Sequence, residues 1–178
     1  LGTFGSMASQ SFHETKNFQC GEGGAVIISD STLIRPAERM RDKGTNRSAM
    51  LRGEIDKYTW TDWGSSYCPS DMLAAYLLAQ LESREQVLRR RKAVWLDYSH
   101  WLGKIPGLAV PNIPKNCDST HHVFYLILPD EKTRDRMILE LRNKGIGTAF
   151  HFVPLHESPM GKILGYRLGD FPAAEKMS

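Results

Sequence analysis

The stretch SFHETKNFQCGEGGAVII, residues 11–28, decides how this chain is interpreted. A single lysine, Lys16, lies in a loop rich in hydroxyl side chains, and a short apolar run follows at residues 25–28. The glycines between them allow backbone to approach a ligand closely. The apolar run is bounded by turn residues, so it predicts a buried strand that begins just after the lysine loop.

Lys16 has two possible uses in such a loop. An uncharged lysine amine is a nucleophile that forms a Schiff base with an aldehyde cofactor. The hydroxyl groups of Ser11 and Thr15 are donors that suit a phosphate group. On chemistry alone, however, a lysine in a loop is more often a solvated surface charge. The composition of the loop leaves both interpretations open.

Outward from this stretch, the first part of the chain predicts loops and helices around one strand. Residues 1–24 are expected to be loop, and a helix capped by Asp30 or Ser31 is expected to end at Gly44. A long polar and aromatic loop is expected over residues 45–69. Residues 71–102 keep one apolar stripe and predict a single helix of about 45 Å, long enough to join two domains.

The last third of the chain predicts a small α/β layer. Strands are expected over residues 122–128 and 146–153, with an amphipathic helix over residues 131–144 between them. We place the boundary between two domains after residue 90. The fold class expected is therefore α/β, with one domain over residues 1–90 and a smaller one over residues 91–178.

Composition excludes several classes of protein. The 178 residues are 41% hydrophobic and 24% charged, with a net charge of +3. Basic and acidic residues are interleaved almost everywhere, and the basic run at residues 89–92 spreads around a predicted helix. This argues against nucleic acid or an anionic membrane as the main partner. Three distant cysteines without metal-ligand spacing favour free thiols in a reducing cytoplasm and no metal site.

The motif SFHETKN (residues 11–17), followed by GEGGA (residues 21–25), resembles the cofactor-lysine motif of the nucleotide-sugar aminotransferases. These are pyridoxal-phosphate enzymes with the aspartate-aminotransferase fold. The resemblance implies fold type I, with this chain as a C-terminal half: the last part of the large domain plus the small domain. It implies that Lys16 forms the Schiff base with pyridoxal phosphate and that Ser11 contacts the cofactor phosphate. Dehydratases of the family have histidine at the lysine position, so Lys16 favours transamination.

Other segments resemble one subgroup of this family. Residues 43–47 and 56–60 are similar to the transaminases that act on dTDP-4-keto-6-deoxy-glucose to give dTDP-4-amino-4,6-dideoxygalactose. Ser66 takes the place of an asparagine that reaches the neighbouring subunit's cofactor, so the resemblance implies cofactor binding by Ser66 and substrate binding by Tyr67. A capped turn before a helix is the alternative for both. His151 is implied as a substrate neighbour, with a structural role as its alternative.

The resemblance also implies a complete activity. Glutamate would donate its amino group to a keto-sugar nucleotide by a ping-pong mechanism, in deoxysugar and lipopolysaccharide biosynthesis. The enzyme would be a cytoplasmic homodimer with shared active sites. The family's remaining cofactor-binding residues would precede this chain, so the chain alone is expected to bind cofactor poorly. The alternative is a non-enzymatic relative used in regulation or assembly. His121 and His122 are interpreted as packing residues.

Overall fold

The computed structural model describes residues 2–178, which divide into two compact units. The first unit extends to Ala93 and includes the distant segment Ser119–His122. The second unit consists of Val94–Asp118 and Val123–Ser178. The short segment 119–122 therefore belongs to the first unit, although its chain neighbours on both sides belong to the second.

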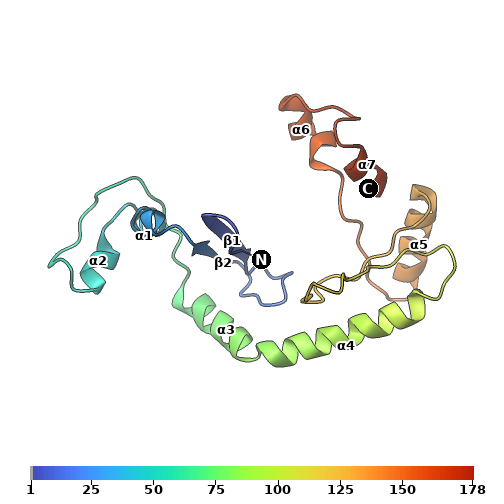
Figure 1. The fold of residues 1–178 in the computed structure, drawn as a ribbon, viewed down its shortest axis with the longest axis horizontal. Coiled ribbons are helices and arrows are strands. Elements are labelled where there is room, and N and C mark those ends of the chain that lie inside the picture. Colours follow the sequence, from blue (N-terminus) through green and yellow to red (C-terminus); the bar gives the residue numbers. More distant parts are fainter. Residues whose placement is uncertain (1) are drawn as a thin grey trace. The chain divides into compact units, whose positions relative to one another are not determined.

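The first unit begins with a β-hairpin (Figure 1). Strand β1 (Met7–Ser11) pairs antiparallel with β2 (Gly24–Ile28), from Met7↔Ile28 to Ser11↔Gly24. The strand predicted at residues 25–28 is confirmed, but the prediction that all of residues 1–24 are loop is wrong. β1 has the sequence MASQS and no apolar run, so its strand state comes from pairing with β2. Val26 is 59% exposed, so β2 is not the buried strand that was predicted.

Two helical segments follow the hairpin. Asp30 Oδ1 accepts a hydrogen bond from the Thr32 backbone N–H at 2.9 Å and caps the 3₁₀ turn η1 (Ser31–Leu33), which leads into α1 (Ile34–Arg41). The predicted helix before Gly44 is thus confirmed. A short helix, α2 (Arg47–Leu51), interrupts the region that was predicted to be loop throughout.

The long predicted helix is two helices, α3 (Asp71–Glu82) and α4 (Arg84–Leu102). Ser70 caps α3 by accepting from the Leu73 N–H at 3.4 Å. At the break, the Ser83 N–H reaches the carbonyls of both Ala79 and Leu81. Its own carbonyl accepts from the Gln86 N–H at 3.0 Å and starts the next helix. The prediction of a single helix was therefore wrong, because Ser83 ends α3 and precedes α4.

In the second unit, Trp95 of α4 packs against residues 123–124. The Trp95 ring meets Phe124 edge to face at 5.3 Å, and its Nε1–H donates to the Val123 carbonyl at 3.3 Å. Asp130 caps α5 (Glu131–Asn143), and this helix confirms its prediction to within one residue. The remaining elements are short: η2 (Leu155–Glu157), α6 (Pro159–Ile163) and α7 (Pro172–Met177).

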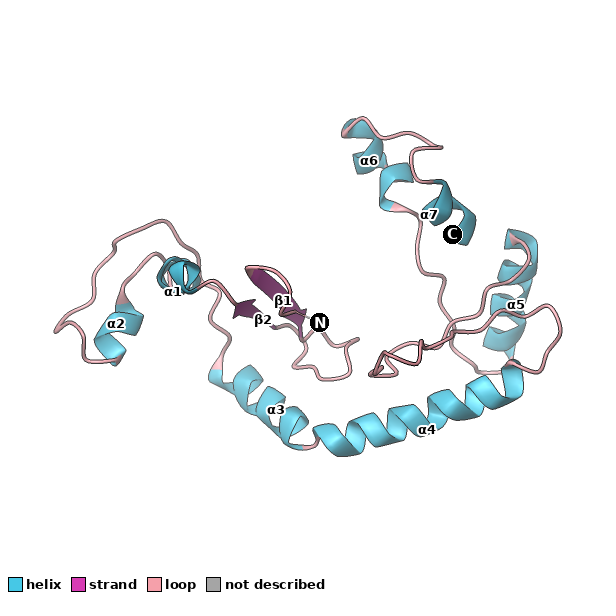
Figure 2. Cartoon of the chain, viewed as in Figure 1, coloured by secondary structure: helices cyan, strands magenta, loops and turns pink. Residues whose placement is uncertain are grey.

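The two strands predicted for this unit are absent (Figure 2). Over residues 122–128 there is one isolated bridge, Ala109↔Ile127, and residues 146–153 have none. A strand needs a hydrogen-bonded partner along its length, and neither segment finds one among residues 2–178. The predicted strands are therefore wrong for this structure.

Few side chains are buried in either unit. Among residues 2–178, the buried hydrophobic side chains are Cys20 and Trp95, and the buried polar ones are Asp42 and His156. Local hydrogen bonds, rather than a large apolar core, therefore hold the described elements in place. None of the described helices combines the length and apolar character needed to cross a membrane.

Candidate cofactor-lysine site

Lys16 lies in the closed loop that joins β1 to β2. Three backbone hydrogen bonds of 2.8–2.9 Å continue the hairpin into this loop: Phe12 N–H to Gly23 O, Cys20 N–H to Phe12 O, and Glu14 N–H to Gly21 O. The Lys16 N–H donates to the His13 carbonyl at 2.9 Å and forms a tight turn. The lysine is therefore presented by a backbone that is fixed on both sides.

His13 shapes this turn through its ring. Its Nδ1 accepts from the Thr15 backbone N–H at 3.2 Å and lies 3.0 Å from the Thr15 hydroxyl. The proton of the neutral ring is therefore on Nε2, which lies 3.6 Å from a Glu22 carboxylate oxygen. Ser11 Oγ accepts from the His13 N–H at 3.3 Å, so the Ser11 hydroxyl keeps its own hydrogen to donate elsewhere.

The Lys16 side chain is exposed, and no hydrogen bond or ion pair of its amine is found within residues 2–178. An amine paired with a carboxylate would be held as the ammonium ion, so an unpaired amine suits covalent bonding to an aldehyde. The Ser11 hydroxyl, which keeps a hydrogen to donate, suits a cofactor phosphate. The residues present therefore fit pyridoxal phosphate.

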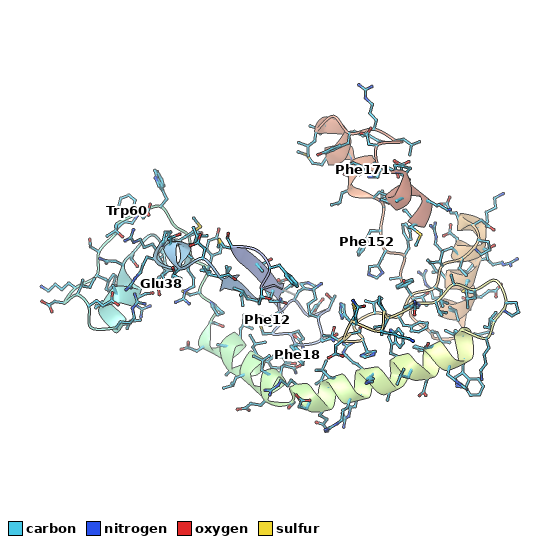
Figure 3. The ribbon with its side chains drawn as sticks, in the orientation of Figure 1. Phe12, Phe18, Glu38, Trp60, Phe152 and Phe171 are labelled. Atoms are coloured by element: carbon cyan, nitrogen blue, oxygen red, sulfur yellow. The ribbon has the colours of Figure 1, made fainter. Side chains whose placement is uncertain are left out.

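Two amide side chains tie the lysine loop to other segments of the first unit. Gln19 Nε2–H donates to the Tyr76 hydroxyl of α3 at 3.1 Å, while Gln19 Oε1 accepts from the Gly21 N–H at 2.8 Å. Figure 3 shows Phe12 and Phe18 on this same loop. Asn17 bonds to Thr120 and His122, more than 100 residues away in the chain.

His122 is thereby placed beside the lysine loop, which corrects its interpretation as a packing residue. Its Nδ1 lies 2.7 Å from Asn17 Oδ1, and its carbonyl accepts from Arg91 at 3.3 Å. Partial burial, together with the charges of Arg91 and Lys16, lowers the pKa of His122 below its ordinary value of 6.5. No local pattern indicates such a contact, because its partners are 105 residues apart.

Ser66 and Tyr67 end a loop that is folded tightly against α1. Five contacts fix it: Thr59 N–H to Asn46 Oδ1, Thr61 N–H to Gly44 O, Lys43 N–H to Ser65 O, and the bridges Asp42↔Ser66 and Thr45↔Trp60. Glycine is required at the two positions where distant parts of this loop come into close contact. A Cβ on Gly44 would overlap the Asp62 carbonyl, and one on Gly64 would overlap the Gly44 amide nitrogen.

The same loop exposes aromatic side chains. Trp60, Trp63 and Tyr67 are 72%, 85% and 67% exposed. Figure 3 shows Trp60 projecting away from α1 and α2. Within residues 2–178, no hydrogen bond joins Ser66 or Tyr67 to the loop that carries Lys16. An ordered loop with an exposed aromatic surface is suited to contact with another molecule.

The two histidines of the segment 150–156 differ in their environments. His151, in the second unit, is exposed, and its ring meets Phe152 at 4.3 Å. His156 is buried, and its Nε2 lies 2.9 Å from Glu175 Oε1, a link between η2 and α7. Phe171 packs on the His156 ring at 4.9 Å and lies close to α7 (Figure 3). His156 thus has a structural role.

Comparison with known proteins now identifies the family. The model of the DegT/DnrJ/EryC1/StrS aminotransferase family matches residues 1–178. The chain belongs to this family. The resemblance that rested on the motif around Lys16 is therefore confirmed, and the lysine loop of this DegT-family chain is its candidate cofactor site.

Two curated relatives act on dTDP-sugars by name. The chain is 32% identical over 182 residues to dTDP-3-amino-3,4,6-trideoxy-alpha-D-glucose transaminase of Streptomyces venezuelae, with all of this chain and 44% of the relative covered. It is 28% identical to dTDP-4-dehydro-2,3,6-trideoxy-D-glucose 4-aminotransferase of Saccharopolyspora spinosa, with 89% of this chain and 43% of the relative covered. The chain spans less than half the length of both relatives, as expected for one half of such a protein.

A solved structure confirms the fold class. The aminotransferase TlmJ from Streptoalloteichus hindustanus superposes with a TM-score of 0.84 at 25% identity. The alignment covers 99% of this chain and 45% of TlmJ. The fold of this DegT-family chain is thus part of the aminotransferase fold, the α/β fold type I predicted from the sequence. Within residues 2–178, no cluster of three metal-ligating side chains is found.

Proposed function

We propose that the whole protein transfers an amino group from glutamate to a keto-sugar nucleotide, with pyridoxal phosphate as cofactor. The observation that carries this proposal is the exposed Lys16 amine, which has no partner within residues 2–178, on a loop closed by backbone hydrogen bonds. Membership of the aminotransferase family supports the reaction class.

Lys16 would be the covalent attachment point and the proton carrier. The cofactor, when bound, supplies an aldehyde carbon and a ring that withdraws electrons. Lys16 would hold that carbon between turnovers. When it is not bonded to that carbon, the Lys16 amine would move a proton between the substrate carbon and the cofactor's C4′. The lack of a carboxylate partner among the described residues favours both roles.

The remaining site residues would orient the cofactor and the sugar. Ser11 would donate its free hydroxyl hydrogen to the cofactor phosphate. Ser66 would donate to the phosphate in the partner subunit of a homodimer, and Tyr67 and His151 would bind the sugar nucleotide. The exposed, tightly braced loop before Ser66 supports this arrangement, since no hydrogen bond joins it to the lysine loop within residues 2–178.

The substrate we propose is dTDP-4-keto-6-deoxy-glucose, aminated at C4. Its support is the subgroup resemblance of residues 43–47 and 56–60, together with a relative whose name specifies a 4-aminotransferase. The product would serve deoxysugar and lipopolysaccharide biosynthesis. A cytoplasmic location is supported by three cysteines that are all free.

The test uses the full-length protein and the variant Lys16→Ala. With pyridoxal phosphate bound, borohydride should fix the cofactor to Lys16, which mass spectrometry of peptides can locate. Lys16→Ala should lose this adduct and lower kcat for glutamate and the keto-sugar by roughly 10²–10⁴-fold or more, the scale of general acid–base catalysis. Lys115→Ala, at another exposed loop lysine, is the matched control and should behave like the wild type.

Two results would count against the proposal. Normal turnover in Lys16→Ala would remove Lys16 from the mechanism. A colourless wild-type protein that borohydride does not modify would favour the alternative, an aminotransferase-like domain that acts in regulation or assembly.

A further inference from the structure

Asn17, the residue after Lys16, makes two hydrogen bonds that define the orientation of its side chain. Its Nδ2–H donates to the Thr120 carbonyl at 2.8 Å. A carbonyl only accepts, so the amide nitrogen must face Thr120 and the amide oxygen must face His122. The oxygen also only accepts, so His122 Nδ1, 2.7 Å away, must carry a proton. One backbone carbonyl thus determines both an amide orientation and a histidine tautomer.

The segment that receives Asn17 is itself held in an unusual backbone conformation. His121 has a φ of 52°, which is uncommon for a residue other than glycine. Such conformations persist where surrounding contacts over-determine them. Here the Ser119 hydroxyl accepts from the His121 N–H at 3.1 Å, and Asn17 binds the residues on either side.

His122 is fixed from a second direction as well. The Arg91 guanidinium of α4 donates to the His122 carbonyl at 3.3 Å. The ring is therefore held by Asn17 and the backbone by Arg91. Lys16 lies close enough for its charge to act on the same ring. The contacts join the lysine loop, α4 and segment 119–122 within the first unit.

We propose that Asn17 and His122 are positioning residues for Lys16, and that their hydrogen bond sets the direction in which the lysine amine is presented to the cofactor aldehyde. This inference rests on the proposed function, because it takes Lys16 as the residue that bonds to pyridoxal phosphate. It gives segment 119–122 a defined use that its sequence does not indicate.

The test measures covalent trapping rather than turnover. Full-length protein is exposed to a subsaturating concentration of pyridoxal phosphate and then to borohydride. The fraction of Lys16 that carries the reduced adduct is measured by mass spectrometry. His122→Leu and Asn17→Leu should each lower this fraction about tenfold. A loss of this size corresponds to one or two neutral hydrogen bonds. His100→Leu, the same substitution at an exposed histidine of α4, should match the wild type.

A conservative variant separates positioning from general stability. His122→Asn places an amide N–H where Nδ1–H was, so it can still donate to Asn17 and should restore trapping to within about twofold of the wild type. Equal losses in His122→Asn and His122→Leu would overturn the proposal, as would normal trapping in His122→Leu.

Unfolding midpoints of the cofactor-free variants show which of them fold. If His122→Leu does not fold, Asn17→Leu decides, because it removes the acceptor for His122 and leaves the His122 ring in place. Reduced trapping in a folded Asn17→Leu then supports the inference, and normal trapping contradicts it. A wild-type protein without any adduct on Lys16 would instead refute the proposed function, and this inference with it.

Discussion

At the scale of single residues, the protonation of His122 links the lysine loop to solution pH. Burial and the neighbouring charges of Arg91 and Lys16 lower its pKa in the folded protein, whereas the unfolded chain has the ordinary value near 6.5. Above pH 6.5 both states are neutral and the full stability is present. As the pH falls from 6.5 through the folded-state pKa, the unfolded state gains the proton first, so stability decreases.

The lowered pKa of His122 predicts how the local unfolding of segment 119–122 depends on pH. Amide hydrogen exchange of segment 119–122, corrected for its intrinsic pH dependence, should show less protection as the pH falls below 6.5. His122→Asn has no titrating ring and should show protection that is independent of pH over the same range. Protection that rises on acidification in the wild type would mean that the folded protein favours the imidazolium.

At the scale of elements, the sequence correctly predicted the helices that local contacts determine. Asp130 sits before an amphipathic run and does cap α5, because the Thr133 N–H reaches its carboxylate at 2.8 Å. The strands predicted at residues 122–128 and 146–153 depend instead on partners elsewhere, and none is found within residues 2–178. β1 shows the converse: MASQS is a strand because β2 pairs with it.

In the candidate site too, residues that are close in the sequence could be predicted, and contacts between distant residues could not. The motif around Lys16 is contiguous, so a resemblance could assign Lys16 and Ser11 before any geometry was known. The contact between Asn17 and His122 spans 105 residues and needed the fold. The helix break at Ser83 was not predicted, because the apolar stripe in the sequence continues on both sides of it.

The loop before Ser66 allows an element-scale prediction. Gly64→Ala would push a methyl group into the Gly44 amide, so the two segments must separate. Overpacking of this kind costs about 1–3 kcal/mol. In the full-length protein we expect the KM for the proposed keto-sugar nucleotide substrate to rise about tenfold or more, because the loop that carries Ser66 and Tyr67 would be displaced. Gly5→Ala, where a Cβ meets nothing closer than the Met7 carbonyl at 3.7 Å, is the control. An unchanged KM in Gly64→Ala would separate this loop from substrate binding.

At the scale of the whole molecule, the described residues bury little apolar surface. Burial of large side chains is the main favourable term in folding, and each contributes about 1.5–3 kcal/mol. Only Cys20 and Trp95 are buried hydrophobic side chains within residues 2–178, while Trp63 and Leu155 are each 85% exposed. The chain spans less than half the length of the two dTDP-sugar relatives.

The 178-residue chain produced by itself should therefore lack a cooperative unfolding transition and bind a hydrophobic dye such as ANS strongly. It should give little borohydride adduct on Lys16 at pyridoxal phosphate concentrations that saturate the full-length protein, and it should turn over no keto-sugar. The hairpin that carries Lys16 is closed by its own hydrogen bonds, so the amine would still be present. What the chain alone would lack is the rest of the cofactor's surroundings. Calorimetry, dye fluorescence and peptide mass spectrometry on the two proteins side by side make the comparison. A sharp calorimetric transition with a stoichiometric adduct on Lys16 of the short chain would show that residues 1–178 suffice to form the site.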